Sequence, residues 1–138
     1  MARGRVLILD ADINKRAAAE LRKRGRNVMS VYTLKIQEML DPALLVDLAD
    51  RYGDDWVLAT ADDRMPYRHA VEVAGSTGAI ATVDPRKPAD VHIDAWRRDI
   101  VHKWADRMQK QEAGSVFRYS MDSVRTWKPR AHYLLDGS

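Results

Sequence analysis

Apolar residues in the first two thirds of the chain are concentrated in four short segments, at residues 5–9, 27–32, 56–60 and 79–83. The segments at 5–9 and 56–60 are continuous apolar runs that do not alternate with polar residues. Runs of this kind are typical of strands that are buried on both faces of a parallel sheet. We therefore expect four parallel strands.

The segments between these runs carry apolar residues at helical spacing. We expect a helix over residues 12–24 with Asp12 as its N-cap, a helix over 41–52 that begins with Asp41 and Pro42, and a short helix over 66–74. Strands that alternate with helices form βαβ units, whose helices cover both faces of the sheet. The expected fold is an α/β three-layer sandwich with a mostly parallel central sheet.

The last part of the chain, residues 90–138, differs from this alternation. Apolar residues at helical spacing predict one long helix, with Trp96 and Trp104 on its apolar stripe. Such a stripe is more typical of a core or dimer contact than of a cofactor site. Residues 115–128 alternate enough to predict a strand or hairpin. With 138 residues, the chain is expected to form one domain that ends in this extension.

Several aspartates follow the predicted strands. Asp10 ends the first strand, Asp62 lies two residues past the third, and Asp84 ends the fourth. Asp41 opens a helix that starts from the same edge of the sheet. Ligands of open parallel sheets bind outside the carboxyl ends of the strands, so these four side chains are expected to converge there. Clustered carboxylates favour a hard cation such as Mg²⁺ or Mn²⁺.

Other polar residues have simpler interpretations. Asp12 is expected to act as a helix cap, and Asp63 is expected to be a solvated loop charge, as are Asp54 and Asp55. Asp84 precedes a proline and is equally consistent with a turn. Of the four histidines, His69 is the nearest in sequence to the expected site, and a surface position is favoured for it over a catalytic one.

Composition excludes several classes of protein. The chain has no cysteine, which rules out disulfides and Cys-ligated metals. Its first apolar run is too short for a signal peptide or a membrane span, so a soluble, cytoplasmic protein is expected, without membrane contact. Residues 1–35 carry nine Lys and Arg against three Asp and Glu, residues 36–94 five against twelve, and residues 95–138 nine against five. An acidic centre between basic flanks suits a metal site beside a polyanion, or ordinary solvated helix faces.

The motifs resemble those of PIN-like domains, in particular the compact group that includes VapC-type toxin ribonucleases. The resemblance covers residues 5–84 and rests on Leu9-Asp10-Ala11-Asp12, on Asp41 opening a helix, and on Thr60-Ala61-Asp62 after the third strand. It implies that Asp10, Asp41 and Asp62 are catalytic acids. Asp84 is the candidate fourth acid, and Glu38 is a possible substitute for Asp41.

The activity implied by this resemblance is metal-dependent cleavage of RNA, by the toxin of a toxin–antitoxin pair. Mg²⁺ or Mn²⁺ at Asp10, Asp62 and Asp84 would activate water for attack on a phosphodiester. RNA phosphates would be held by basic residues close to the acids, and the candidates are Arg64, Arg68, Lys15 and Arg16. An antitoxin peptide is the expected protein partner, and a homodimer through the Trp96/Trp104 helix is a further possibility.

Three alternatives remain open. A phosphoacceptor receiver domain also has acids after its first and third strands, but the usual lysine after a fifth strand has no counterpart that we can assign. A haloacid-dehalogenase-type phosphatase begins with Asp-x-Asp, as Asp10-Ala11-Asp12 does, but expects Thr or Val where Asn14 stands. A PIN-like module that binds RNA or a partner without cutting is the non-enzymatic alternative.

Overall fold

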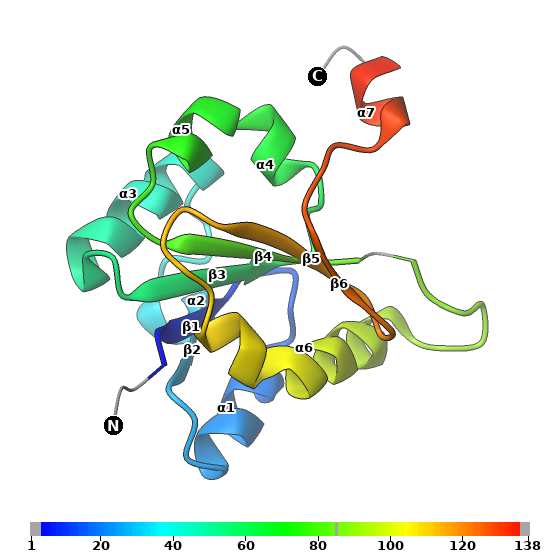
Figure 1. The fold of residues 1–138 in the computed structure, drawn as a ribbon. Helices are drawn as coiled ribbons and strands as arrows, with labels where there is room; N and C mark the ends of the chain where they lie inside the picture. The colour runs from blue at the N-terminus through cyan, green and yellow to red at the C-terminus, as the bar shows by residue number, and fades with distance from the viewer. Residues whose placement is uncertain (1–3, 85, 136–138) are drawn as a thin grey trace.

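A six-stranded sheet runs through the centre of the protein, whose computed structural model describes residues 4–84 and 86–135 (Figure 1). The strand order is β2-β1-β3-β4-β5-β6. The first five strands are parallel, and β6 pairs with β5 as an antiparallel hairpin. The strands are β1 (Val6–Leu9), β2 (Val28–Ser30), β3 (Trp56–Thr60), β4 (Ala79–Val83), β5 (Val116–Tyr119) and β6 (Val124–Thr126).

Helices cover both faces of this sheet. On one face α1 (Lys15–Lys23) and α6 (Ile93–Gln109) pack side by side, below the sheet in Figure 1. On the other face lie α2 (Val31–Leu34), α3 (Asp41–Tyr52), α4 (Met65–Arg68) and α5 (Ala70–Ala74). The predicted α/β three-layer sandwich is therefore confirmed. No helix in the described ranges is long and apolar enough to cross a membrane.

Each central strand contributes to two separate cores. In β1, Leu7 and Leu9 face the α1/α6 layer, whereas Val6 and Ile8 face the α3 layer. All four side chains are buried, as continuous apolar runs predict for a sheet covered on both faces. The carboxyl ends of the strands remain the natural place for a site, because apolar side chains fill both faces.

The buried ring of Trp56 fixes the amino end of β3. Its indole Nε1 donates a hydrogen bond to the Gly53 carbonyl at 2.9 Å, and the ring faces Gly78. A Cβ atom at residue 78 would lie 2.2 Å from two ring carbons, so only glycine fits there.

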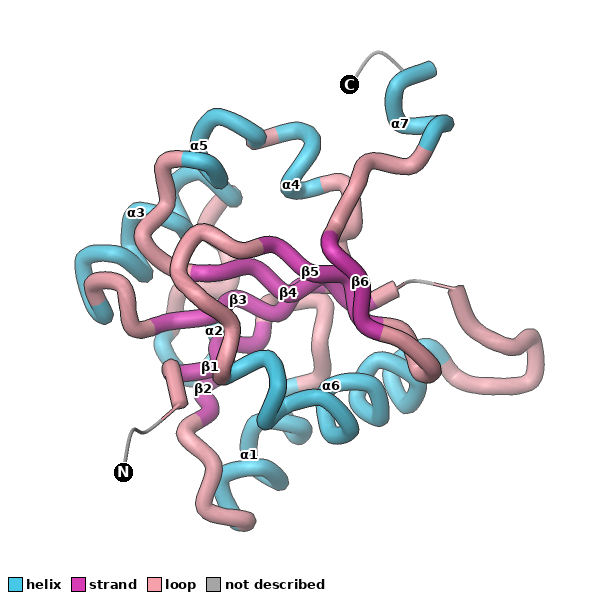
Figure 2. Tube along the Cα trace, in the orientation of Figure 1, coloured by secondary structure: helices cyan, strands magenta, loops and turns pink. Residues whose placement is uncertain are grey.

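The C-terminal extension adds the hairpin and the long helix that the sequence predicts. Residues 86–92, before α6, form a long loop (Figure 2). The last helix, α7 (Ala131–Leu135), stands beside α4, where the rings of Tyr67 and Tyr133 are 6.4 Å apart. On α6, Trp96 and Trp104 pack against the core, and the Trp104 indole donates to the Ser120 carbonyl at 2.7 Å. These two rings are thus core contacts, and each also stays partly exposed.

Two predicted element boundaries are wrong, and the predicted helix over residues 41–52 is confirmed as α3. The cap of α1 is Asn14, whose side chain accepts a hydrogen bond from the Arg16 N–H, and not Asp12. The second strand ends at Ser30 instead of Tyr32, because the Ser30 hydroxyl accepts from the Tyr32 N–H and starts α2. Asp41 lies within the first turn of α3, and the N-cap of that helix is Leu40.

Candidate functional site

The site lies where β1 and β3 end. The chain leaves β1 toward α1 on one face of the sheet and leaves β3 toward α4 and α5 on the other (Figure 1). Doubly wound folds bind ligands at such a divergence between neighbouring strands, and we refer to this edge of the sheet, at Asp10 and Asp62, as the crevice. Asp10 follows β1, and Thr60, Ala61 and Asp62 close β3, so the predicted residues border this crevice.

Asp12 holds the loop after β3 in place. Its carboxylate accepts hydrogen bonds from the Ala61 N–H at 3.0 Å and from the Thr60 hydroxyl at 3.3 Å. The same hydroxyl accepts from the Asp62 N–H at 3.1 Å. Burial raises the pKa of Asp12 to about 6, and the negative charge of Asp10 adds to the increase. Asp12 therefore links the two halves of the crevice, a role that its expected function as a helix cap did not include.

Three acids influence one another across the crevice. Burial raises the pKa of Asp10, and the charge of Asp62 raises it further. Hydrogen bonds from the Ala11 N–H and the Thr60 hydroxyl lower the pKa but do not offset this increase. Burial also raises the pKa of Asp41, together with the charges of Asp10 and Asp62. Asp10, Asp41 and Asp62 come from three separate segments, and their negative charges are only partly compensated.

Two basic side chains reach this group from α4 and the residue after it. Arg68 Nη1 lies 3.9 Å from Asp62 Oδ2, and His69 Nε2 lies 3.6 Å from Asp41 Oδ2. The charge of Arg68, and that of His69 when it is protonated, lower the pKa of Asp41, but burial and the neighbouring acids outweigh them. His69, for which a surface position was favoured, is partly buried beside an acid of the site.

The other predicted RNA-binding residues lie around the crevice. Lys15 lines a pocket of about 290 Å³ together with Asp12 and Tyr32, next to the end of β1. Arg16 is exposed beside it on the first turn of α1. The Arg64 guanidinium lies 4.9 Å from the centre of the Tyr133 ring, which directs it toward α7.

Glu38 does not replace Asp41. It is exposed in the turn before α3 and makes no hydrogen bond or ion pair with any residue that the structure describes. Asp41 is the acid that is electrostatically coupled to Asp10 and Asp62.

The carboxylates do not form a ready-made metal cage. Among residues 4–84 and 86–135, no three His, Cys, Asp or Glu side chains are arranged to hold a metal ion together. The donor chemistry nevertheless suits a hard cation, because aspartate oxygens line the crevice and their repulsion is only partly compensated. A cation there would have to draw Asp10, Asp41 and Asp62 closer together.

Asp84 lies at the same edge of the sheet but has different partners. The Arg86 guanidinium donates to both of its oxygens, with Nη2 2.9 Å from Oδ2, and Arg130 Nη2 lies 3.3 Å from Oδ2. Burial alone would raise the pKa of Asp84, but these arginines hold it below its usual value. The prediction that Asp84 shares a metal with Asp10 and Asp62 does not fit this arrangement, because arginines already neutralise its charge.

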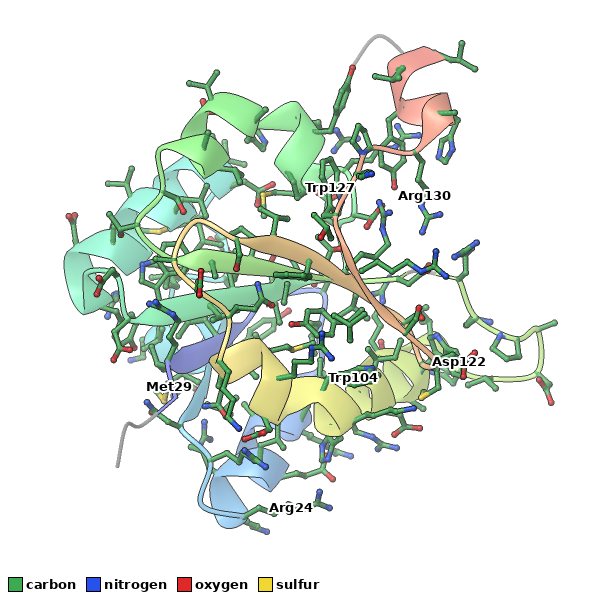
Figure 3. All side chains as sticks on the ribbon, in the orientation of Figure 1. Arg24, Met29, Trp104, Asp122, Trp127 and Arg130 are labelled. Atoms are coloured by element: carbon green, nitrogen blue, oxygen red, sulfur yellow. The ribbon has the colours of Figure 1, made fainter. Side chains whose placement is uncertain are left out.

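Asp63 was expected to be a solvated charge, and that expectation is wrong. Its side chain is 2% exposed and accepts hydrogen bonds from Arg118 on β5 and from the Tyr133 hydroxyl on α7. Arg130 Nε lies 3.4 Å away, and the Trp127 indole donates to the Asp63 carbonyl at 3.1 Å. Figure 3 shows Trp127 and Arg130 near α4 and α7, in the region of these contacts. Nothing near Asp63 in the sequence indicates partners so distant along the chain.

Comparison with known proteins gives no independent assignment. No family model matches the chain, and neither a curated protein nor a solved structure is significantly similar to it. The resemblance to PIN-like domains thus stays a prediction that rests on the motifs.

Proposed function

We propose that the protein is a PIN-like, metal-dependent endoribonuclease whose catalytic acids are Asp10, Asp41 and Asp62. The observation that carries this proposal is the electrostatic coupling of these three carboxylates at the β1/β3 crevice. A protein gains no stability by gathering like charges, so a cluster of this kind indicates function. The placement of the cluster at the crevice agrees with the general position of ligands in doubly wound folds.

The carboxylate oxygens of this site suit Mg²⁺ or Mn²⁺ as the cofactor. Asp10 and Asp62 would hold the cation, and Asp41 would contribute to the same site. When bound, the cation would activate a water molecule for attack on the phosphodiester and stabilise the departing oxygen. Asp12 would position the Thr60–Asp62 loop through its two hydrogen bonds, and thereby orient Asp62. Asp84 is not part of this set.

RNA would be held through its phosphates by basic residues at the rim of the crevice. Arg68 lies beside Asp62, and Lys15 lines the pocket next to Asp12. Arg64 and Arg16 are near these two in the chain and complete the candidate set. Contacts of this kind bind any sequence and weaken as salt increases.

The biological role that we propose is that of a cytoplasmic toxin, whose antitoxin would cover the acidic crevice. This role rests on the resemblance to VapC-type toxins alone. Expression without a partner checks it directly, because growth arrest is expected from the wild-type protein and not from Asp10→Asn. Normal growth with the active protein would contradict the toxin role and would leave the nuclease activity open.

Cleavage of RNA tests the activity itself. With Mg²⁺ or Mn²⁺, the wild-type protein should cut single-stranded RNA, and EDTA should stop it. Asp10→Asn and Asp62→Asn should each reduce the rate by about 100-fold or more, since metal-assisted catalysis contributes several kcal/mol. Asp122→Asn, at an exposed position in the β5–β6 hairpin, is the matched control. Equal cutting by all four proteins would identify a contaminating nuclease and refute the proposal.

The strand order favours one competing function. Phosphoacceptor receiver domains share the order of β2-β1-β3-β4-β5, with acids after the first and third strands. The chain after β5, however, continues with Ser120, Met121 and Asp122 and has no lysine there. Acetyl phosphate or beryllofluoride should therefore leave Asp62 unmodified, whereas a stable Asp62 adduct would favour the receiver.

A further inference from the structure

A second pocket lies at the same edge of the sheet, at the ends of β4 and β5. It has a volume of about 270 Å³ and is lined by four arginines, two serines and one aspartate. The arginines are Arg86, Arg118, Arg125 and Arg130. None of them belongs to the set expected to bind RNA, and three of them lie in the C-terminal extension.

The pocket has an excess of positive charge. Its two acids are Asp84, which lines it, and Asp63, which lies behind it and binds Arg118 and Arg130. Four guanidinium groups face two carboxylates, which leaves a net charge of +2. Asp122, in the hairpin turn (Figure 3), does not line the pocket. A bound anion would neutralise this excess positive charge.

Two guanidinium groups have donors to spare. The exposed side chain of Arg125 makes no hydrogen bond or ion pair with the residues that the structure describes. Arg130 Nη2 is buried and lies 3.3 Å from Asp84, but it makes no hydrogen bond. A buried donor without a hydrogen bond is costly, and an anionic ligand would satisfy it.

Most of the pocket wall is already held in place. Arg118 is fixed by two hydrogen bonds to Asp63, and Arg86 by its bonds to Asp84. The hydroxyls of Ser120 and Ser123 are 2.9 Å apart and form a hydrogen bond with each other. A purely structural role would account for Arg118 and Arg130, which connect β5 and the segment before α7 to Asp63. It would not account for Arg125 or for the pocket itself.

We propose that this pocket binds a phosphate group of RNA. Guanidinium groups match phosphate geometry and can donate two parallel hydrogen bonds to it. The RNA part of the proposal rests on the proposed nuclease function. Asp63 follows Asp62 directly in the chain, and β5 lies two strands from β3, which is about 10 Å. One RNA strand can therefore reach both the arginine pocket and the acidic crevice.

Binding without cleavage tests the proposal. Three probes are compared in EDTA: oligouridylate with a 5′-phosphate, the same oligomer with a 5′-hydroxyl, and pyrophosphate. The variant is Arg125→Gln, because the arginine side chain at this position makes no hydrogen bond or ion pair with the described residues that the change would break. Arg24→Gln, an exposed arginine on the distant end of α1 (Figure 3), is the matched control. Thermal unfolding of both variants confirms that the fold is intact.

Arg125→Gln should weaken RNA binding by about tenfold, as expected for hydrogen bonds to a charged group, and Arg24→Gln should not. The slope of log affinity against log salt should fall by about 0.7, the value for one phosphate on a single strand. If Arg125→Gln loses affinity only for the 5′-phosphorylated oligomer, the pocket binds a terminal phosphate. If it loses affinity equally for both oligomers, the pocket binds an internal phosphate.

Two results would overturn the proposal. The first is RNA binding that Arg125→Gln changes no more than Arg24→Gln does. The second is an effect of Arg125→Gln on pyrophosphate alone, which would assign the pocket to a free phosphate compound. RNA cleavage by the wild type and by Asp10→Asn is a separate measurement. The nuclease proposal can therefore be refuted while the pocket is confirmed, and the pocket can be refuted while the nuclease proposal is confirmed.

Discussion

Arg118 donates hydrogen bonds to both carboxylate oxygens of Asp63, from Nε at 2.7 Å and from Nη2 at 2.6 Å. The two residues are 55 positions apart, so this pair ties β5 to the loop that carries Asp62. The Tyr133 hydroxyl joins the same carboxylate and brings α7 against that loop. The C-terminal extension thus supports the wall of the crevice.

Removing the charge of Asp63 should destabilise the whole protein. Asp63→Asn leaves Arg118 without its buried counter-charge and Arg130 with Asp84 alone, and breaking one side of a buried ion pair costs about 3–5 kcal/mol. Urea unfolding at pH 7 measures the loss. Asp122→Asn, at an exposed position, should change stability by less than about 0.5 kcal/mol. A fully stable Asp63→Asn protein would mean that the pair contributes nothing to folding.

Stability without metal should fall as the pH rises through the range in which Asp12 ionises. Its pKa is raised from 3.8 to about 6, so the folded protein favours the protonated carboxyl. The free energy of unfolding begins to fall near the pKa that Asp12 has in the unfolded chain, and the fall is complete above its pKa in the folded protein. The total loss is on the order of 1–3 kcal/mol. Asp12→Asn in EDTA should be more stable than the wild type at pH 8, with no such gain at pH 4. A gain that is the same at both pH values would contradict this account.

Magnesium should stabilise the protein through the acidic crevice. A ligand that binds only the folded state at ten times its Kd adds about 1.4 kcal/mol, which corresponds to a rise of a few degrees in Tm. Asp10→Asn should remove this rise, and in EDTA it should itself raise Tm, because it removes charge repulsion. Differential scanning fluorimetry with and without Mg²⁺ measures both effects. An unchanged response to Mg²⁺ in Asp10→Asn would place the cation elsewhere.

The contact between Gly78 and Trp56 should not tolerate a side chain. In Gly78→Ala the new Cβ would lie 2.2 Å from a fully buried ring, and overpacking of this kind costs about 1–3 kcal/mol or more. Gly75→Ala is the control, since its nearest neighbour would be the Val71 carbonyl at 3.5 Å. Chemical denaturation should separate the two variants clearly, and equal stabilities would show that the Trp56 ring can move aside.

The sheet could be predicted because its information is local. Continuous apolar runs define β1, β3 and β4, and their order in the chain places Asp10 and Asp62 at one edge. The boundaries that were wrong depend on single hydrogen bonds, such as the Ser30 cap that ends β2 early.

The partners of the acids could not be predicted in the same way. Asp63 and Asp84 look like Asp62 in the sequence, since each follows a strand. Their arginines and Tyr133 come mainly from the C-terminal extension, which is distant from Asp63 and Asp84 along the chain. Asp12 illustrates the same limit, because its partner is the Thr60–Ala61 segment, 48 and 49 residues away.

Both outer strands of the sheet, β2 and β6, are only three residues long, and β6 carries Arg125. Such short edge strands offer few free backbone groups for another chain to extend the sheet. Aggregation by edge-to-edge pairing is thereby disfavoured. An antitoxin or any other protein partner is consequently expected to recognise side-chain surfaces, and not to add a strand to this sheet.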